Sequence, residues 1–129
     1  MSLLLDTHVV IAASRGELTS AYPRFRALLA VGDHDLIASV ASLWEIAIKT
    51  RLGKLAPAVA PPDIAPLLGS MAISVLSIEP RHATAVLDRE PGTRDPFDRM
   101  LLAQCQVEGL RLVTVDRALV DHPLAWQPA

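Results

Sequence analysis

Four acidic side chains are the residues of this 129-residue chain whose surroundings most favour chemistry, and two of them end predicted strands. Asp6 follows the apolar run Leu3-Leu4-Leu5, and Asp116 follows a second apolar run at 110–115. Each run predicts a short buried strand. Ligands of open parallel sheets bind at the carboxyl ends of the strands, so both acids are expected at that edge.

The other two acids are expected near the same edge because they lie early in predicted helices. Asp98 comes directly after Asp95-Pro96-Phe97, in which an Asp cap followed by Pro is a strong helix start. Glu45 lies in the first two turns of an earlier helix. In an α/β sheet the helices begin where the strands end, so the four carboxylates are predicted to converge.

Each acid also has an ordinary explanation when taken alone. Asp6 and Asp116 could cap the turns that follow them, and Asp98 could complement a helix dipole. Glu45 precedes Lys49 by four residues, and such an exposed pair contributes only about 0.2–0.5 kcal/mol. Four carboxylates at one edge, however, would repel one another unless a cation neutralised them. Oxygen ligands of this kind select Mg²⁺ or Mn²⁺, which could orient a water and assist an in-line displacement at a phosphodiester.

The elements that must position these acids alternate along the chain. Strands are expected at 3–5, 34–38, 73–78 and 110–115, and an edge strand could form at 124–126. Helices are expected at 7–14, 19–31, from Ser39 or Ser42 to 52, at 64–71, 79–88 and 95–108, with one turn at 117–120. The proline-rich stretch 53–66 and the polar stretch 89–94 are expected to be loops. This alternation predicts one α/β domain over residues 1–129 with a parallel sheet of four to five strands.

The composition limits the class of protein and its partners. Hydrophobic residues make up 51% of the chain and the mean hydropathy is +0.34, which is more apolar than a small monomer needs. A homodimer, a tight protein partner, or both are therefore expected. The net charge of −2 gives no global basic footprint for duplex binding. All but two of the twelve cationic residues are Arg, which suits bidentate phosphate contact.

Targeting signals and disulfides are not predicted. The single cysteine, Cys105, excludes an internal disulfide and is expected on the apolar stripe of its helix. The N-terminus has no basic stretch before its apolar run, and no apolar run approaches the roughly 20 residues that span a bilayer. A cytoplasmic protein without a membrane segment is expected.

Five short motifs occur in order along almost the whole chain. They are L-L-D-T-H around Asp6, S-L-W-E-I-A-I-K around Glu45, G-K-L after that helix, D-P-F-D-R-M-L-L-A-Q at 95–104, and L-V-T-V-D ending at Asp116. Together they resemble the PIN-domain ribonucleases, and most closely the VapC-type toxins of bacterial toxin–antitoxin pairs.

The acidic tetrad of that family falls on Asp6, Glu45, Asp98 and Asp116. Its third acid stands sixteen residues before the Thr of the T-x-D strand end, and counting back from Thr114 gives Asp98. Asp95 is then the helix cap. No member of the tetrad is missing, so the resemblance implies an active enzyme.

The resemblance implies a PIN-like three-layer α/β/α sandwich around a parallel sheet, and a Mg²⁺- or Mn²⁺-dependent endoribonuclease that cuts RNA. It also implies a small antitoxin as partner, and a homodimer or a dimer of toxin–antitoxin heterodimers. Asp6 and Asp98 are expected to contact the metal directly. Glu45 and Asp116 would complete its coordination, some through water.

Several neighbours of the tetrad have two possible roles each. Thr7 and Thr114 could bond the carboxylates or an RNA phosphate, or serve only as strand-end hydroxyls. Arg99 could hold an RNA phosphate or remain a solvated surface residue. His8 is expected to be structural, and Trp44 is expected to pack rather than to stack on a base.

Three alternatives compete with the nuclease. A phosphatase of the haloacid-dehalogenase type needs a second Asp two residues after Asp6, where His8 stands. A receiver-type domain needs a late Lys, but the only lysines are Lys49 and Lys54. A catalytically silent PIN-like module that binds RNA or protein remains as the alternative function, and the intact tetrad favours the enzyme over it.

Overall fold

The computed structural model describes residues 1–26 and 34–127 of the chain. In this part four parallel strands form one sheet in the order β3–β2–β1–β4. The strands are β1 (Ser2–Leu5), β2 (Asp35–Ser39), β3 (Ile73–Leu76) and β4 (Arg111–Val113). Leu5 lies opposite Ala38 of β2 and Val113 of β4, so these strands end at nearly the same level. The predicted parallel sheet is confirmed, with the lower of the two expected strand counts.

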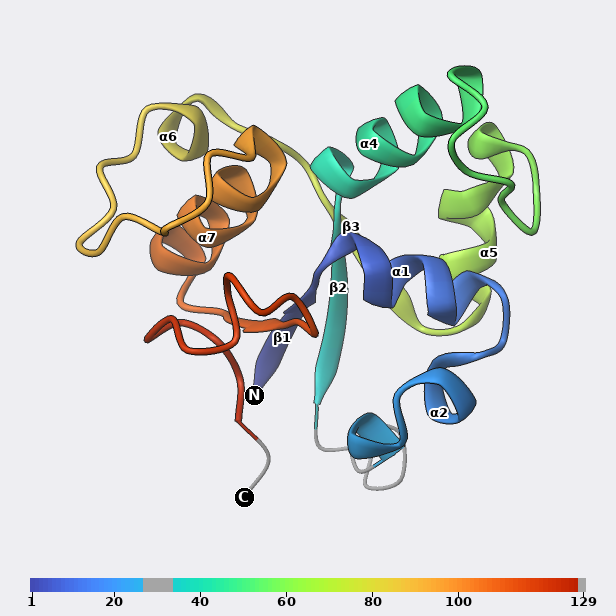
Figure 1. Ribbon diagram of the computed structural model, residues 1–129, viewed down its shortest axis with the longest axis horizontal. Helices are drawn as coiled ribbons and strands as arrows, with labels where there is room; N and C mark the ends of the chain where they lie inside the picture. Colours follow the sequence, from blue (N-terminus) through green and yellow to red (C-terminus); the bar gives the residue numbers. More distant parts are fainter. Residues whose placement is uncertain (27–33, 128–129) are drawn as a thin grey trace.

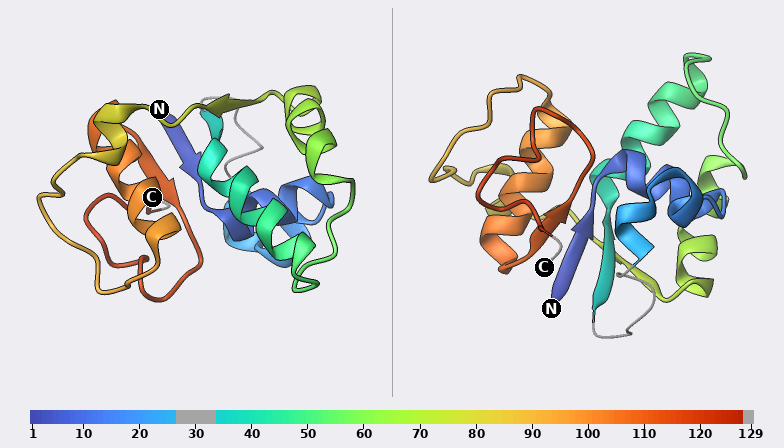
Figure 2. Two further views of the ribbon diagram at one scale, coloured as in Figure 1. Left: turned by 90° about the horizontal axis from the view of Figure 1, so that it is seen from above. Right: turned by 60° about the horizontal axis from the view of Figure 1, so that its bottom comes forward.

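Helices cover both faces of this sheet. They are α1 (Thr7–Ser14), α2 (Leu18–Ala21), α4 (Val40–Arg51), α5 (Ile64–Ser70), α6 (Pro80–Ala83) and α7 (Pro96–Glu108), with 3₁₀ turns at Pro23–Phe25 and Pro61–Asp63. Figure 1 shows α6 and α7 on one side of the strands and α1, α2 and α5 on the other, and the views in Figure 2 agree. The predicted three-layer α/β/α sandwich is therefore confirmed. Within the described residues, no helix combines the length and the apolar character needed to cross a bilayer.

The central strand β1 supplies the core of both layers. Leu3 and Leu5 are fully buried in a cluster with Val9 and Phe25, whereas Leu4 is fully buried in a second cluster against α7. Successive side chains of a strand point to opposite faces, so a strand covered on both sides needs an unbroken apolar run. This explains why the run before Asp6 contains three leucines in succession.

Capping residues start three helices at or near the carboxyl ends of the strands. Asp6 caps α1, and Ser39 caps α4 by accepting a hydrogen bond of 3.0 Å from the Ala41 N–H. Ser39 is thus the helix start, and the alternative, Ser42, lies inside the helix. Asp95 caps α7 by accepting from the Phe97 N–H at 2.8 Å, as predicted. These caps satisfy backbone donors that a helix start leaves unpaired.

The helix predicted over 19–31 is wrong in its described part. The structure has α2, then a break at Tyr22, then a 3₁₀ turn that begins at Pro23. Proline has no N–H to continue a helix, and it disfavours helical geometry in the residue before it. Tyr22 accordingly adopts φ −133° and ψ 75°. Residues 27–31 of this prediction lie outside the described residues.

The helix predicted over 79–88 is also wrong, because α6 ends at Ala83. The following segment bonds to α7 rather than to itself. Gln106 of α7 donates to the Val86 carbonyl at 2.9 Å and accepts from the Asp88 N–H at 2.9 Å. One side chain of α7 thereby replaces the bonds that would have continued the helix.

Both of the later strands are shorter than predicted. The strand expected at 73–78 ends at Leu76, and the one expected at 110–115 ends at Val113. The latter stops because the Thr114 hydroxyl accepts the Asp116 N–H at 3.0 Å, which closes a local turn. The edge strand expected at 124–126 is reduced to a single parallel bridge between Leu112 and Ala125.

Candidate active site

Asp6 lies at the carboxyl end of the central strand and is only 3% exposed. Its N–H donates to the Val113 carbonyl at 2.9 Å, which ties it to the end of β4. One carboxylate oxygen accepts from the Val9 N–H at 3.1 Å, and the other accepts a short bond from the Thr114 hydroxyl. Burial raises the pKa of Asp6 above its usual value, and these hydrogen bonds oppose that shift in part.

Glu45 brings the second carboxylate to this edge from α4. It is 5% exposed, and both of its oxygens have partners. The Thr7 hydroxyl donates to Oε1 at 2.7 Å, and Lys49 Nζ donates to Oε2 at 2.7 Å. Ser42 Oγ lies 3.0 Å from Thr7 Oγ1 and supports that hydroxyl. The pair of Glu45 and Lys49 is therefore more than a surface contact, because its carboxylate is buried.

Asp98 lies in the first turn of α7 and is partly buried. Its pKa is raised to about 7, first by burial and then by the negative charges of Asp95, Asp116, Glu45 and Asp6. The other three members of the tetrad are therefore near enough to Asp98 to disfavour its ionised form. Asp95, by contrast, has a carboxylate oxygen engaged by two N–H groups at the start of α7, as expected of a cap.

Asp116 follows β4 after a short turn. Its N–H donates to Thr114 Oγ1 at 3.0 Å, and its carboxylate accepts from the Ala118 N–H at 2.8 Å. Thr114 thus accepts from the backbone of one acid and donates to the side chain of another. The structure brings all four predicted acids to one edge of the sheet, where Thr7 and Thr114 each donate to one of them.

The donor set at this edge suits a hard divalent cation. In residues 1–26 and 34–127 no three His, Cys, Asp or Glu side chains are close enough to form a ready cage for an ion. The protein's own donors hold the oxygens of Asp6 and Glu45 instead. Mg²⁺ binds through one or two carboxylates and retains several waters, so a set of spaced carboxylates fits it. Burial is the largest cause of the raised pKa of Asp98, and repulsion by the neighbouring carboxylates, which such a cation would relieve, adds to it.

The side chains of Arg99 and His8 lie near the tetrad but form no hydrogen bond with its carboxylates in the described residues. The guanidinium of Arg99 bonds Glu90 Oε1 at 3.0 Å and the Ala85 carbonyl at 3.1 Å, so it braces the loop before α7. Contact of Arg99 with RNA stays a prediction that would require these bonds to break. His8, expected to be structural, is exposed at the start of α1, and its interaction with Asp6 lowers the pKa of that carboxyl against the larger effect of burial.

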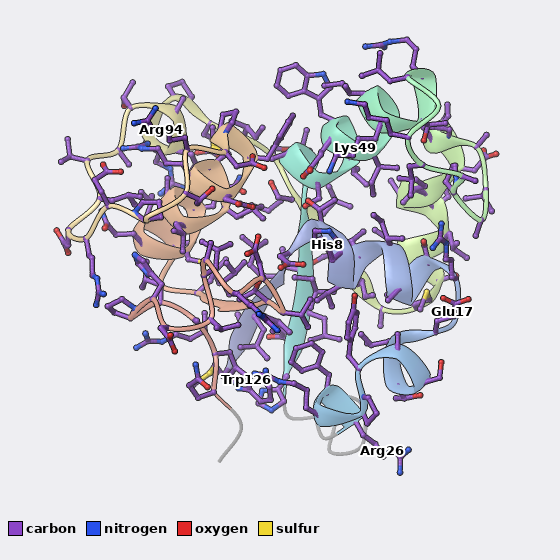
Figure 3. All side chains as sticks on the ribbon, viewed as in Figure 1. His8, Glu17, Arg26, Lys49, Arg94 and Trp126 are labelled. Carbon is purple, nitrogen blue, oxygen red and sulfur yellow. The ribbon has the colours of Figure 1, made fainter. Side chains whose placement is uncertain are left out.

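Two residues of α4, Ser42 and Lys49, contribute to the site in ways that the sequence indicates only in part. Ser42 precedes Glu45 by three residues, a spacing that places both side chains on one helix face. That spacing is the sequence signal for a role of Ser42 beside Glu45. The four-residue spacing predicts that Lys49 pairs with Glu45. The helix pattern does not predict that the Glu45 carboxylate is buried. Figure 3 shows Lys49 on α4 and His8 at the start of α1, both at the carboxyl edge of the sheet.

An apolar groove of about 230 Å³ adjoins the tetrad. Trp44 precedes Glu45 and Phe97 precedes Asp98, and their rings meet edge to face at 5.6 Å. Trp44, expected to pack, contacts the Phe97 ring but remains 60% exposed. The residues that line the groove come from the starts of α4 and α7 and from the segment after β3: Ala41, Trp44, Ile78, Pro96, Phe97 and Met100.

Thr114→Val is expected to destabilise the protein by about 1–3 kcal/mol in urea unfolding monitored by circular dichroism. The substitution removes the donor to the buried Asp6 carboxylate and the acceptor for the Asp116 N–H. Thr50→Val is the matched control, because Thr50 Oγ1 is buried and has no hydrogen-bond partner among the described residues. The control should be neutral or stabilising, and equal unfolding curves for the two variants would contradict the role of Thr114.

Comparisons with known proteins agree with this geometry. One chain of the crystal structure of VapBC2 from Rickettsia felis bound to a DNA fragment from their promoter is similar over 97% of this chain and 96% of that chain. The TM-score is 0.61 at 13% sequence identity, so this likeness concerns the fold. No curated protein sequence gave a match. The PIN domain family matches residues 3–123, which include all four acids, and the chain therefore belongs to the PIN domain family, whose members are generally nucleases.

Proposed function

We propose that this PIN-domain protein is a Mg²⁺- or Mn²⁺-dependent endoribonuclease and the toxin of a toxin–antitoxin pair. The observation that carries the proposal is the buried Asp6 at the end of the central strand, with Glu45, Asp98 and Asp116 around it. The all-oxygen donor set and the match of the whole tetrad to the family motif support metal-dependent cleavage of a phosphodiester.

Each acid has a role in this proposal. Asp6 and Asp98 would hold the ion directly, and Glu45 and Asp116 would complete its coordination, some through water. A divalent ion held by these residues would supply positive charge for the transition state of an in-line displacement and would lower the pKa of an attacking water. Asp98 must release its proton before it can serve as a ligand, since its pKa is about 7.

Hydroxyl groups keep these carboxylates in place. Thr7 fixes one oxygen of Glu45, and Thr114 fixes one oxygen of Asp6. Because these hydroxyls are themselves buried, the carboxylates are aligned before substrate arrives. Direct contact of Thr7 or Thr114 with RNA would compete with these bonds, so their proposed role is alignment.

A small antitoxin protein and a second copy of the chain are the proposed protein partners. The motif resemblance to VapC-type toxins supports the antitoxin, as does the shared fold with a chain of the VapBC2 structure. The exposed apolar groove beside Trp44 supports a protein contact close to the site. A cytoplasmic location is part of the same proposal.

A cleavage assay separates the enzyme from a silent binding module. The purified protein is incubated with a fluorogenic single-stranded RNA in Mg²⁺, in Mn²⁺ and in EDTA. Cleavage in either metal and none in EDTA is expected, and expression of the chain alone should arrest bacterial growth. Binding of RNA without cleavage under all conditions would favour the binding module instead.

A further inference from the structure

Lys49 is the cationic side chain in direct contact with the tetrad, and its geometry suggests a role in holding RNA. The inference rests on the proposed RNA cleavage. We propose that Lys49 Nζ binds an RNA phosphate at the acidic edge while it remains next to Glu45. It is thereby a substrate-binding residue of the same site.

The exposure of the pair supports contact with a ligand from solvent. Lys49 Nζ is 2.7 Å from Glu45 Oε2, and the side chains are 40% and 7% exposed respectively. An ammonium group has three N–H donors, and Glu45 takes one of them. Two donors therefore remain for acceptors that reach this edge from outside.

The position of the ammonium group relative to α7 supports a phosphate as that acceptor. Lys49 Nζ lies 2.7 Å from Glu45 Oε2 on α4, and the carboxylates of Asp95 and Asp98 on α7 are near enough to interact electrostatically with it. A phosphate arriving at this edge meets several negative charges, and a fixed cation would offset part of that repulsion.

Other cations are less well placed. Among the described residues, Lys49 is the one Lys or Arg with an ion pair to a tetrad carboxylate. Arg99, next to Asp98 in the sequence, is held by Glu90 and the Ala85 carbonyl. The competing explanation is that Lys49 serves only to neutralise Glu45, and a double-mutant design separates the two.

The experiment measures binding of a fluorescein-labelled single-stranded RNA in EDTA, where no cleavage occurs. Lys49→Met is compared with Lys49→Arg, and both are repeated in the Glu45→Gln background. Lys54→Met is the matched control, since Lys54 is exposed on the turn after α4. Lys49→Met should raise the Kd for RNA about tenfold in both backgrounds. This is the effect expected when one charge-assisted hydrogen bond to a phosphate is lost.

The salt dependence gives a second readout. One lost phosphate contact on a single strand should reduce the slope of log Kd against log salt by about 0.7 for Lys49→Met. Lys49→Arg should retain most of the affinity, and Lys54→Met should leave both the Kd and the slope unchanged. A tenfold change that disappears in the Glu45→Gln background would overturn the proposal, because Lys49 would then act only through Glu45.

The failure of this inference differs from a failure of the proposed function. If the unmodified protein cleaves RNA in Mg²⁺ and Lys49→Met binds RNA no more weakly than Lys54→Met, the inference alone is wrong. If the unmodified protein neither binds nor cleaves RNA, both are wrong. Melting curves of every variant in EDTA check that the comparison is made between folded proteins.

Discussion

Asp6→Asn is expected to reduce metal-dependent RNA cleavage by about 10²–10³-fold while the fold remains intact. The substitution removes a fixed negative charge from the end of the central strand, and loss of one preorganised electrostatic group at a reacting centre has effects of this size. Asn caps a helix about as well as Asp, so α1 should keep its start. Cleavage is measured with the fluorogenic RNA in saturating Mg²⁺.

Asp35→Asn is the matched control for this experiment. Asp35 is an exposed Asp at the opposite end of the sheet, where it begins β2. Its substitution should leave cleavage unchanged. Asp6→Asn should also be at least as stable as the unmodified protein at pH 8 in EDTA, because burial raises the pKa of Asp6. Full cleavage activity in Asp6→Asn would remove the proposed mechanism.

The metal-free protein is expected to lose stability as the pH rises from about 4 to about 7. The pKa of Asp98 is raised from 3.8 to about 7 in the folded protein, so folding favours its protonated form. This contribution is fully present below the unfolded pKa of 3.8 and is lost as the pH rises through the folded pKa. Asp98 is only partly buried, and solvent screening limits the change to about 2 kcal/mol.

Urea unfolding in EDTA over this pH range measures the effect. Asp98→Asn should flatten the pH dependence, whereas Asp88→Asn, at an exposed loop position, should leave it in place. Addition of Mg²⁺ should stabilise the protein more at pH 8 than at pH 5, since the ion and the proton compete for the same carboxylate. An equally steep pH dependence in Asp98→Asn and in the unmodified protein would contradict the proposed environment of Asp98.

The main elements and the placement of the acids could be predicted because their signals are local. Asp6 follows an unbroken apolar run that only a strand buried on both faces requires, and Asp95-Pro96 marks a helix start. The signal for the end of α7 is equally local. Gly109 follows the helix and adopts φ 70°, which Gly accommodates without strain. Such features depend on a few adjacent residues, so the sequence alone is sufficient.

The remaining features depend on residues far apart in the chain. The end of α6 depends on Gln106, which bonds a segment some twenty residues earlier. The burial of Glu45 depends on Thr7, 38 residues before it. Helix periodicity predicted the pair with Lys49 but not its burial, because burial is set by α1 rather than by α4. Pro23 is itself a local signal for a break in the helix. The prediction of one helix over 19–31 followed the apolar spacing instead of this proline.

The exposed position of Trp44 has a practical consequence for finding what covers the groove. The chain has two tryptophans, and the other, Trp126, is packed 6.1 Å from the Phe25 ring, far from the acidic edge. A molecule that settles on the groove would transfer Trp44 from water to an apolar environment and shift its emission to the blue. Trp126 would serve as the internal reference. The wavelength of Trp44 emission therefore reports whether a molecule is bound in this groove.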